Sequence, residues 1–202
     1  MCPTPAAPNT AGLSPRLSGN RDTSGLSATA GRASPQTKHC SPEQLPKRER
    51  LTMTTHLDTP TDLLRLVGQP LGTTEWIEVT QQQVDLFADA TNDHQWIHTD
   101  PQRAVNGPFH GTIAHGYLTL SLAPVLIAEV LQIRELAAAL NYGLNKVRFP
   151  APVRVGASIR AHITLRSADQ KTSGVESVFA LTYEIRGEHR PGCVADIIVL
   201  YP

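Results

Sequence analysis

The segment HGYLTLSLAPVLIA, residues 115–128, is the longest apolar stretch of the chain and decides its fold. It is apolar on nearly all sides and carries no charge before Glu129, a pattern typical of a buried helix. Pro124 lies inside it, so we expect a kink or a first-turn boundary at that point. A helix buried all round needs a layer of structure wrapped around it.

The sequence that follows residue 140 supplies that layer. Apolar and polar residues alternate there with a period of two, which predicts strands over residues 144–149, 159–165, 175–185 and 194–200. Turn-forming residues separate the last three strands, at residues 168–171 and 187–192. Long strands joined by short turns indicate an antiparallel sheet.

The sequence before the apolar segment predicts shorter elements. We expect a short helix over residues 60–67, a strand over residues 73–79 and a helical turn at residues 102–105. Thr80 and Gln83 have the spacing of a capping box, which predicts a helix from residue 80 that ends near Asn92. The expected fold is therefore α+β, a single domain in which an antiparallel sheet wraps around a central apolar helix.

Residues 1–56 differ in composition from the rest of the chain. They are rich in Pro, Ser, Thr, Ala and Gly and hold almost no aromatic residues, so we expect a disordered N-terminal extension before a domain over residues 57–202. Met1 and Met53 are the two methionines of the chain. Because Met53 lies at this junction, two interpretations stay open: a genuine tail, or an artefact of the assigned translation start.

Charge and cysteine content limit the partners and the compartment. The net charge is zero, with seven Lys/Arg against three Asp/Glu in residues 1–52 and eleven against fifteen in residues 53–202. A solvated tail explains the basic head better than a binding arm, so we expect no nucleic-acid partner. No apolar run reaches the roughly 20 residues of a membrane span, and the N-terminus lacks the pattern of a secretory signal. Of three cysteines, Cys193 alone lies in the expected domain, which favours a reducing cytoplasm.

The segment ATNDHQWIHTDP, residues 90–101, concentrates titratable groups next to turn-forming residues. Asp93 and His98 are five positions apart, so a turn between them can aim both side chains at one small volume. A carboxylate and an imidazole that share a water molecule form an acid/base pair. The alternative is structural: Asp93 caps a helix end and His98 packs as a satisfied core residue.

A second candidate is the pair His115 and Gly116, directly before the apolar helix. The N–H groups at a helix start have no partner inside the helix and can stabilise an oxyanion. Alternatively, Gly116 only permits close packing and His115 only caps the helix. We expect no metal site, because His94, His98, His110 and His115 show no i, i+4 spacing with a supporting Glu and no cysteine pairs occur. There is also no glycine-rich phosphate loop and no nucleophile elbow around Ser121.

These two segments together resemble the MaoC-like dehydratase, or (R)-specific enoyl-CoA hydratase, family. Its core reads roughly Gly-Asp-x-Asn-Pro-Ile/Leu-His-x-Asp, followed by Ala-His-Gly and the central helix. Asp93, Ile97, His98 and Asp100 stand at the matching positions, and residues 113–116 read Ile-Ala-His-Gly. Residues 146–156 also resemble the family's strand and turn after the helix, and the likeness covers about residues 70–202.

The chain departs from the family pattern at three positions. Asn92 replaces a glycine, Gln95 an asparagine and Trp96 a proline, a form that resembles the nodulation-protein-N-like subgroup. Gln95 keeps an amide that can orient the pair, and Trp96 brings a large ring that can line or narrow an acyl pocket. The departures leave the acid/base pair intact.

The resemblance implies a hot-dog fold that acts as a homodimer, with the site at or near the subunit interface. It implies hydration of a trans-2-enoyl-CoA to a (3R)-3-hydroxyacyl-CoA, and the reverse dehydration, with Asp93 and His98 as catalytic residues. The Gly116 N–H would polarise the thioester carbonyl. The implied substrate-binding residues are Gly116, His115, Gln95, Trp96 and Ile97. No metal or redox cofactor is implied, since coenzyme A is part of the substrate.

Two other functions fit the same fold. A hot-dog acyl-CoA thioesterase usually carries a carboxylate on or beside the central helix, and nothing acidic occurs between Gly116 and Ala128. A non-catalytic acyl-CoA-binding relative would have no need of the Asp93 and His98 pair. Both observations favour the hydratase.

Overall fold

The structure, a computed structural model, describes residues 54–202. The predictions on residues 1–53, including the translation start at Met53, lie outside these residues. The first element, β1, begins at Thr55, two residues before the predicted domain start. The elements before the central helix are β1 (Thr55–Leu57), the 3₁₀ helix η1 (Pro60–Leu66), β2 (Pro70–Thr73), β3 (Ile77–Glu78), α1 (Gln81–Thr91), α2 (Trp96–Thr99) and α3 (Pro101–Ala104).

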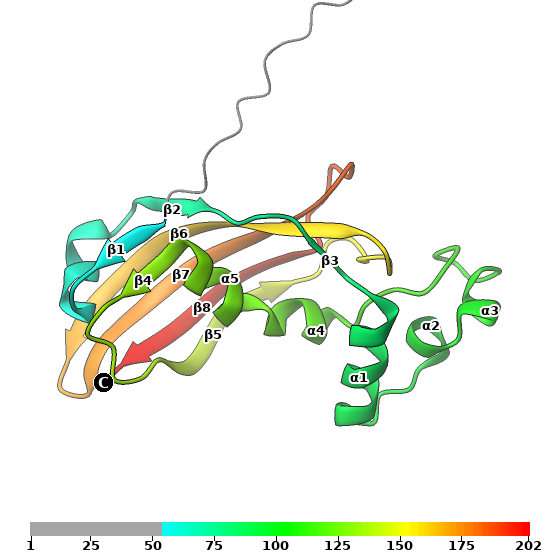
Figure 1. The fold of residues 1–202 in the computed structure, drawn as a ribbon, viewed down its shortest axis with the longest axis horizontal. Helices are drawn as coiled ribbons and strands as arrows, with labels where there is room; N and C mark the ends of the chain where they lie inside the picture. Colours follow the sequence, from blue (N-terminus) through cyan, green and yellow to red (C-terminus); the bar gives the residue numbers. More distant parts are fainter. Residues whose placement is uncertain (1–53) are drawn as a thin grey trace, which may run out of the picture. The chain divides into compact units, whose positions relative to one another are not determined.

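The sheet follows the predicted antiparallel pattern (Figure 1). Its order is β2-β6-β7-β8-β5, and β3 also pairs with β6. The long strands are β5 (Leu140–Arg148), β6 (Ser158–Lys171), β7 (Gly174–Ile185) and β8 (Cys193–Tyr201). Alternate residues along β6 and β7 are buried on one face, in register with each other, as Ile163 opposite Leu181 illustrates. A separate two-stranded parallel sheet joins β1 to β4 (Leu131–Ile133).

The apolar segment forms two helices, α4 (Gly116–Ser121) and α5 (Ala123–Val130), in front of the curved sheet (Figure 1). The helices meet at Leu122, and Pro124 lies in the first turn of α5, where its missing N–H costs no helical bond. Burial is one-sided, however. Leu126 and Val130 face the core, whereas Tyr117 and Val125 are 71% and 69% exposed. The prediction of a helix buried all round is therefore wrong for the side of the helix that faces away from the sheet.

Helix α1 begins and ends as its sequence predicts. Thr80 Oγ1 accepts a hydrogen bond from the Gln83 N–H, and Gln83 Oε1 accepts one from the Thr80 N–H. Asn92 ends the helix in the left-handed conformation, with φ 57°. Helices α1, α2 and α3 lie beyond the end of the sheet at which α4 begins (Figure 1).

Two predicted boundaries are wrong. Residues 168–171 are not a turn but the end of β6, because their backbone continues to pair with β7 and Lys171 reaches Glu176. The turn instead precedes Gly174, where a Cβ would come within 2.0 Å of the Tyr201 carbonyl oxygen. The strand predicted over residues 73–79 is split between β2 and β3. Just after β2, the Thr74 hydroxyl, rather than a main-chain carbonyl, accepts the Ala161 N–H.

Candidate active site

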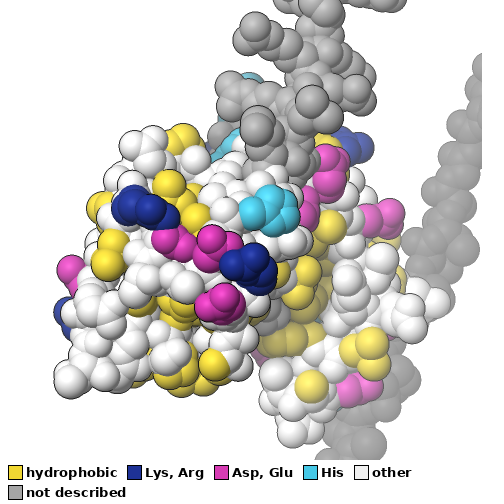
Figure 2. Space-filling model, turned by 60° about the vertical axis from the view of Figure 1, so that its left-hand side comes forward, with side chains coloured by type: hydrophobic (Ala, Val, Ile, Leu, Met, Phe, Trp, Pro, Cys, Tyr) yellow, Lys and Arg dark blue, Asp and Glu magenta, His cyan; other side chains and the backbone are white. Residues whose placement is uncertain are grey.

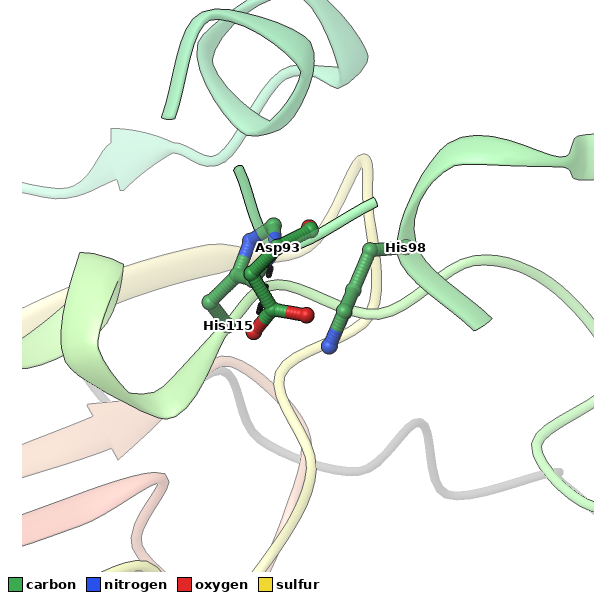
Figure 3. A group of neighbouring side chains, drawn as sticks. All are labelled: Asp93, His98 and His115. Atoms are coloured by element: carbon green, nitrogen blue, oxygen red, sulfur yellow. Dashed lines mark hydrogen bonds and ion pairs between the residues drawn. The ribbon is translucent and has the colours of Figure 1, made fainter. Parts of the chain in front are cut away.

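Three side chains from separate elements meet beside the start of α4 (Figure 3). Asp93 follows the left-handed turn at Asn92, His98 belongs to α2, and His115 is the residue that precedes α4. One nitrogen or carboxylate oxygen from each lies within 4.8 Å of the others. The structure thus brings the predicted pair together and adds a second imidazole.

The buried His98 ring is held by a hydrogen bond at Nδ1. It is 8% exposed, and its Nδ1 lies 2.7 Å from the Ile113 carbonyl oxygen, which can only accept a hydrogen bond. Nδ1 therefore donates, and the Nε2 lone pair faces Asp93. Burial lowers the pKa of His98, and the nearby His115 lowers it further, while the Ile113 bond and Asp93 act in the opposite direction. The net lowering favours a neutral imidazole near pH 7.

Asp93 combines a fixed backbone with an accessible carboxylate. Its main-chain carbonyl accepts a hydrogen bond from His115 Nε2 at 2.9 Å. Its side chain is 59% exposed, and Oδ2 lies 4.0 Å from the same nitrogen. A carboxylate that is open on one side can orient a water molecule or a substrate group that approaches from solvent.

His115 is committed to protein contacts. It is 3% exposed, and its ring stacks on His98 with centroids 3.8 Å apart and planes at 26°. Phe87 packs against the same ring at 5.0 Å. Since Nε2 donates to Asp93, the free lone pair is on Nδ1, which is buried and has no hydrogen-bond partner among residues 54–202.

The three groups could in principle bind a metal ion, but their geometry is unfavourable. Imidazole binds a metal in the plane of its ring, at about 2.0–2.1 Å for zinc. The rings of His98 and His115 are stacked and nearly parallel, so an ion in the plane of one ring lies well out of the plane of the other. That no metal is needed therefore remains a prediction, and the donor arrangement favours it.

Gly116 begins α4, next to the three side chains. A Cβ at this position would approach the Phe149 ring to 3.1 Å, so close packing is one reason for glycine. The N–H groups of a first helical turn have no partner inside the helix. The packing interpretation and the oxyanion interpretation are therefore compatible.

The remaining predicted site residues are dispersed. Gln95 precedes α2 and is exposed. Ile97 pairs through its carbonyl with the Ile113 N–H at 3.0 Å. The Trp96 ring packs against Gly107 and lies under the Arg103 guanidinium at 4.4 Å. Residues two apart on a helix point about 200° from each other, so Trp96 and His98 leave α2 in opposite directions.

One supporting residue, Gln81, was not predicted from the sequence. Its side-chain Nε2 donates to the His98 carbonyl at 2.8 Å, and its Oε1 accepts from the Thr112 hydroxyl at 2.6 Å. It thereby links α1, α2 and the segment before α4. Gln81 follows the capping residue Thr80, where a polar residue is unremarkable, so only the tertiary structure reveals this role.

An antiparallel sheet curved around a helix, with a carboxylate and an imidazole at the helix start, defines a hot-dog protein with a candidate acid/base site. Residues 62–185 match the MaoC like domain, and the chain belongs to the MaoC-like dehydratase family. The predicted resemblance and the predicted enzyme class, a hydratase or dehydratase, are confirmed.

Two curated relatives illustrate the similarity. The chain is 48% identical over 141 residues to 3-hydroxyacyl-thioester dehydratase Z of Mycobacterium tuberculosis, covering 69% of this chain and 93% of the relative. It is 45% identical over 142 residues to nodulation protein N of Rhizobium leguminosarum bv. viciae, covering 69% and 88%.

Solved structures support the fold. The (R)-hydratase from A. caviae involved in PHA biosynthesis aligns with a TM-score of 0.56 at 22% identity, over 67% of this chain and 96% of that one. The unliganded R-hydratase PhaJ1 from Pseudomonas aeruginosa aligns with a TM-score of 0.55 at 21% identity, over 67% and 81%. The predicted hot-dog fold is confirmed.

Proposed function

We propose that this chain adds water to trans-2-enoyl-CoA to give (3R)-3-hydroxyacyl-CoA, and catalyses the reverse dehydration, with Asp93 and His98 as the acid/base pair. The observation that carries the proposal is the neutral Nε2 of His98, aimed at an accessible Asp93 carboxylate at the start of α4. The similarity to 3-hydroxyacyl-thioester dehydratase Z supports the substrate class.

In this mechanism a water molecule lies between the two groups. His98 Nε2 accepts one proton of the water while the water oxygen bonds to C3 of the enoyl group, and the Asp93 carboxylate accepts the other O–H as a hydrogen bond. Electrons from the C2–C3 double bond move toward the thioester carbonyl. The pair then returns one proton to C2, so the net change is the addition of one water molecule.

The other predicted residues have supporting roles in this proposal. The Gly116 N–H would polarise the thioester oxygen and stabilise the charge that develops on it. Gln95 and Ile97 would lie beside the acyl group. For Trp96 and His115, the contacts with Arg103 and His98 compete with a lining role.

A homodimer is the proposed active form. Strand β5 is an edge of the sheet, and Leu140, Tyr142 and Leu144 at alternate positions are 48%, 63% and 48% exposed. An exposed apolar edge strand pairs readily with another chain. Tyr117 and Val125 extend the apolar surface onto the outer side of α4 and α5. A second copy that adds its β5 would continue the sheet and cover these helices near the site.

Other partners have less support. On the face drawn in Figure 2, Lys and Arg side chains lie beside Asp and Glu, without a large patch of one sign. This favours the expected absence of a nucleic-acid partner. No helix of residues 54–202 is both long and apolar enough to cross a bilayer. A cytoplasmic location stays a prediction, based on cysteine usage.

The two alternative functions make distinct predictions. A thioesterase would release free coenzyme A from a saturated acyl-CoA, and a binding protein would retain enoyl-CoA without converting it. Within the described helices α4 and α5, no residue before Glu129 carries a carboxylate that a thioesterase could use. The paired acid and base likewise favour catalysis over binding alone.

The direct test is a crotonyl-CoA assay that follows loss of the conjugated enoyl thioester and identifies the product enantiomer. Asp93→Asn and His98→Gln should each reduce kcat/KM by about 10²–10⁴-fold, the usual contribution of a positioned acid or base. Asp89→Asn and His94→Gln are matched controls, since both side chains are largely exposed on or just after α1. Retention of activity within a few-fold in both site variants would refute the mechanism.

A further inference from the structure

His115 contacts both members of the acid/base pair. Its Nε2–H donates to the main-chain carbonyl of Asp93 at 2.9 Å, and its ring stacks on His98 at 3.8 Å. His115 is 3% exposed, and the Phe87 ring packs against it with ring centroids 5.0 Å apart. One buried side chain therefore makes a directional contact with the acid and a face-to-face contact with the base.

The contact with Asp93 is important because the Asp93 backbone lies outside α1 and is not held by helical hydrogen bonds. Asn92 ends the helix, and α2 does not begin until Trp96, so Asp93 lies in the connection between them. Its side chain is 59% exposed and gains little from packing. The hydrogen bond from His115 joins residues 22 positions apart and fixes the main-chain carbonyl of Asp93. It therefore also fixes the backbone position from which the Asp93 carboxylate extends.

The contact with His98 fixes the remaining freedom of that ring. The bond from Nδ1 to the Ile113 carbonyl holds one edge, and stacking on His115 holds the plane. The nearby His115 also lowers the pKa of His98, in the same direction as burial. The titratable groups that face His98 are Asp93, from the α1–α2 connection, and His115, from the start of α4.

We propose that His115 is a positioning residue that sets the relative geometry of Asp93 and His98 and the electrostatic environment of the His98 ring. This inference rests on the proposed function and replaces the predicted substrate-binding role of His115. A packing residue would need only a ring, whereas His115 retains a buried Nδ1 with no partner in the part of the chain that the structure describes, which costs stability. Its Nε2 donor is what a simple apolar ring cannot supply.

The two contacts can be separated by substitution. His115→Phe keeps a ring over His98 and removes the donor to Asp93, while His115→Gln keeps a donor of similar reach and removes the ring. Phe87→Leu is the control, because it changes the packing of His115 without removing either contact with the pair. Each variant is compared by thermal unfolding and circular dichroism, so that kcat is expressed per folded molecule.

For His115→Phe we expect kcat to fall by about 10²-fold, the effect of misplacing a catalytic group by about 1 Å, with KM within about threefold of wild type. For His115→Gln we expect a smaller fall of about tenfold in kcat and an acid limb of kcat/KM that moves to higher pH, because His98 no longer adjoins a second imidazole. Phe87→Leu should leave the pH profile unmoved.

Three outcomes would overturn the inference. They are kcat within about twofold of wild type in both His115 variants, a rise in KM that accounts for the whole loss, or an acid limb that stays in place in His115→Gln. Nitrogen-15 NMR titration of the His98 ring in the free protein supplies an independent readout. Its midpoint should rise in His115→Gln, and an unmoved midpoint would also overturn the inference. Because this titration uses no substrate, failure of the wild type to hydrate crotonyl-CoA would refute the proposed function separately.

Discussion

Replacement of Trp96 by alanine separates two roles for this ring. Trp96 is partly buried and contacts Gly107 and the Arg103 guanidinium. A buried aromatic side chain covers about 150–250 Å² of apolar surface. If Trp96→Ala removes about two thirds of that buried area, the loss at roughly 25 cal/mol per Å² is about 2.5–4 kcal/mol of unfolding free energy. The cation–π contact adds about 0.5–1 kcal/mol. We therefore expect Trp96→Ala to lower the free energy of unfolding by about 3–5 kcal/mol.

A ring that limits the acyl pocket would have another effect. One methylene in an apolar pocket is worth about 1–3 kcal/mol, so its removal should shift the preferred enoyl-CoA toward longer chains. From the contacts with Arg103 and Gly107, we expect an unchanged chain-length profile and reduced stability. The assay is kcat/KM for enoyl-CoAs of increasing length, beside a urea denaturation curve.

The second tryptophan supplies the matched control. Trp76 is also partly buried, and the guanidinium groups of Arg160 and Arg186 lie over its ring at 4.5 and 4.6 Å from the centroid. Trp76→Ala should cost a similar amount of stability and leave the chain-length profile unchanged. A shift of preference toward longer chains in Trp96→Ala, absent in Trp76→Ala, would refute the packing argument and establish the ring as a pocket wall.

Four further results are expected. Gly116→Ala should lower stability by about 1–3 kcal/mol through overpacking against Phe149, and Phe149→Leu should restore part of it in thermal unfolding. Gln81→Ala should reduce kcat by about tenfold, since a support of the His98 backbone is lost, and unchanged kinetics would contradict that role. Tyr142→Glu should dissociate the dimer in light scattering, and a wild-type protein that is already monomeric would exclude the interface. Because the pKa of His98 is lowered from 6.5, kcat/KM should have its full value at pH 7 and should fall only at a pH below 6.5. An acid limb of kcat/KM above pH 6.5 would contradict a neutral His98 imidazole.

Local sequence signals predicted much of this fold. The capping box at Thr80 and Gln83, the helix end near Asn92 and the alternation along β6 to β8 depend on residues close in sequence. The start and end of α1 and the presence of these three strands were therefore predicted correctly, although the end of β6 was not. Asp93 and His98 were predicted as neighbours for the same reason, since one short connection joins them.

Features that depend on distant contacts were not predicted. The stacking of His115 on His98 and the bond from Gln81 to His98 join residues that only the tertiary structure brings together. The contacts of Trp96 with Gly107 belong to the same class. The exposure of Tyr117 was missed because an apolar helix looks alike whether the chain itself or a second subunit covers it.

The order of strands in the sheet has a consequence for synthesis. Strand β5 precedes β6 and β7 along the chain, but its partner is β8. On the ribosome, β5 therefore emerges early and stays without its hydrogen-bonded neighbour until β8 has been translated. Such long-range pairing is slow and leaves an apolar strand exposed to aggregation in the meantime. A nascent chain stalled before residue 193 should accordingly depend on chaperones, and release of β8 should let it pair with β7 on one side and β5 on the other.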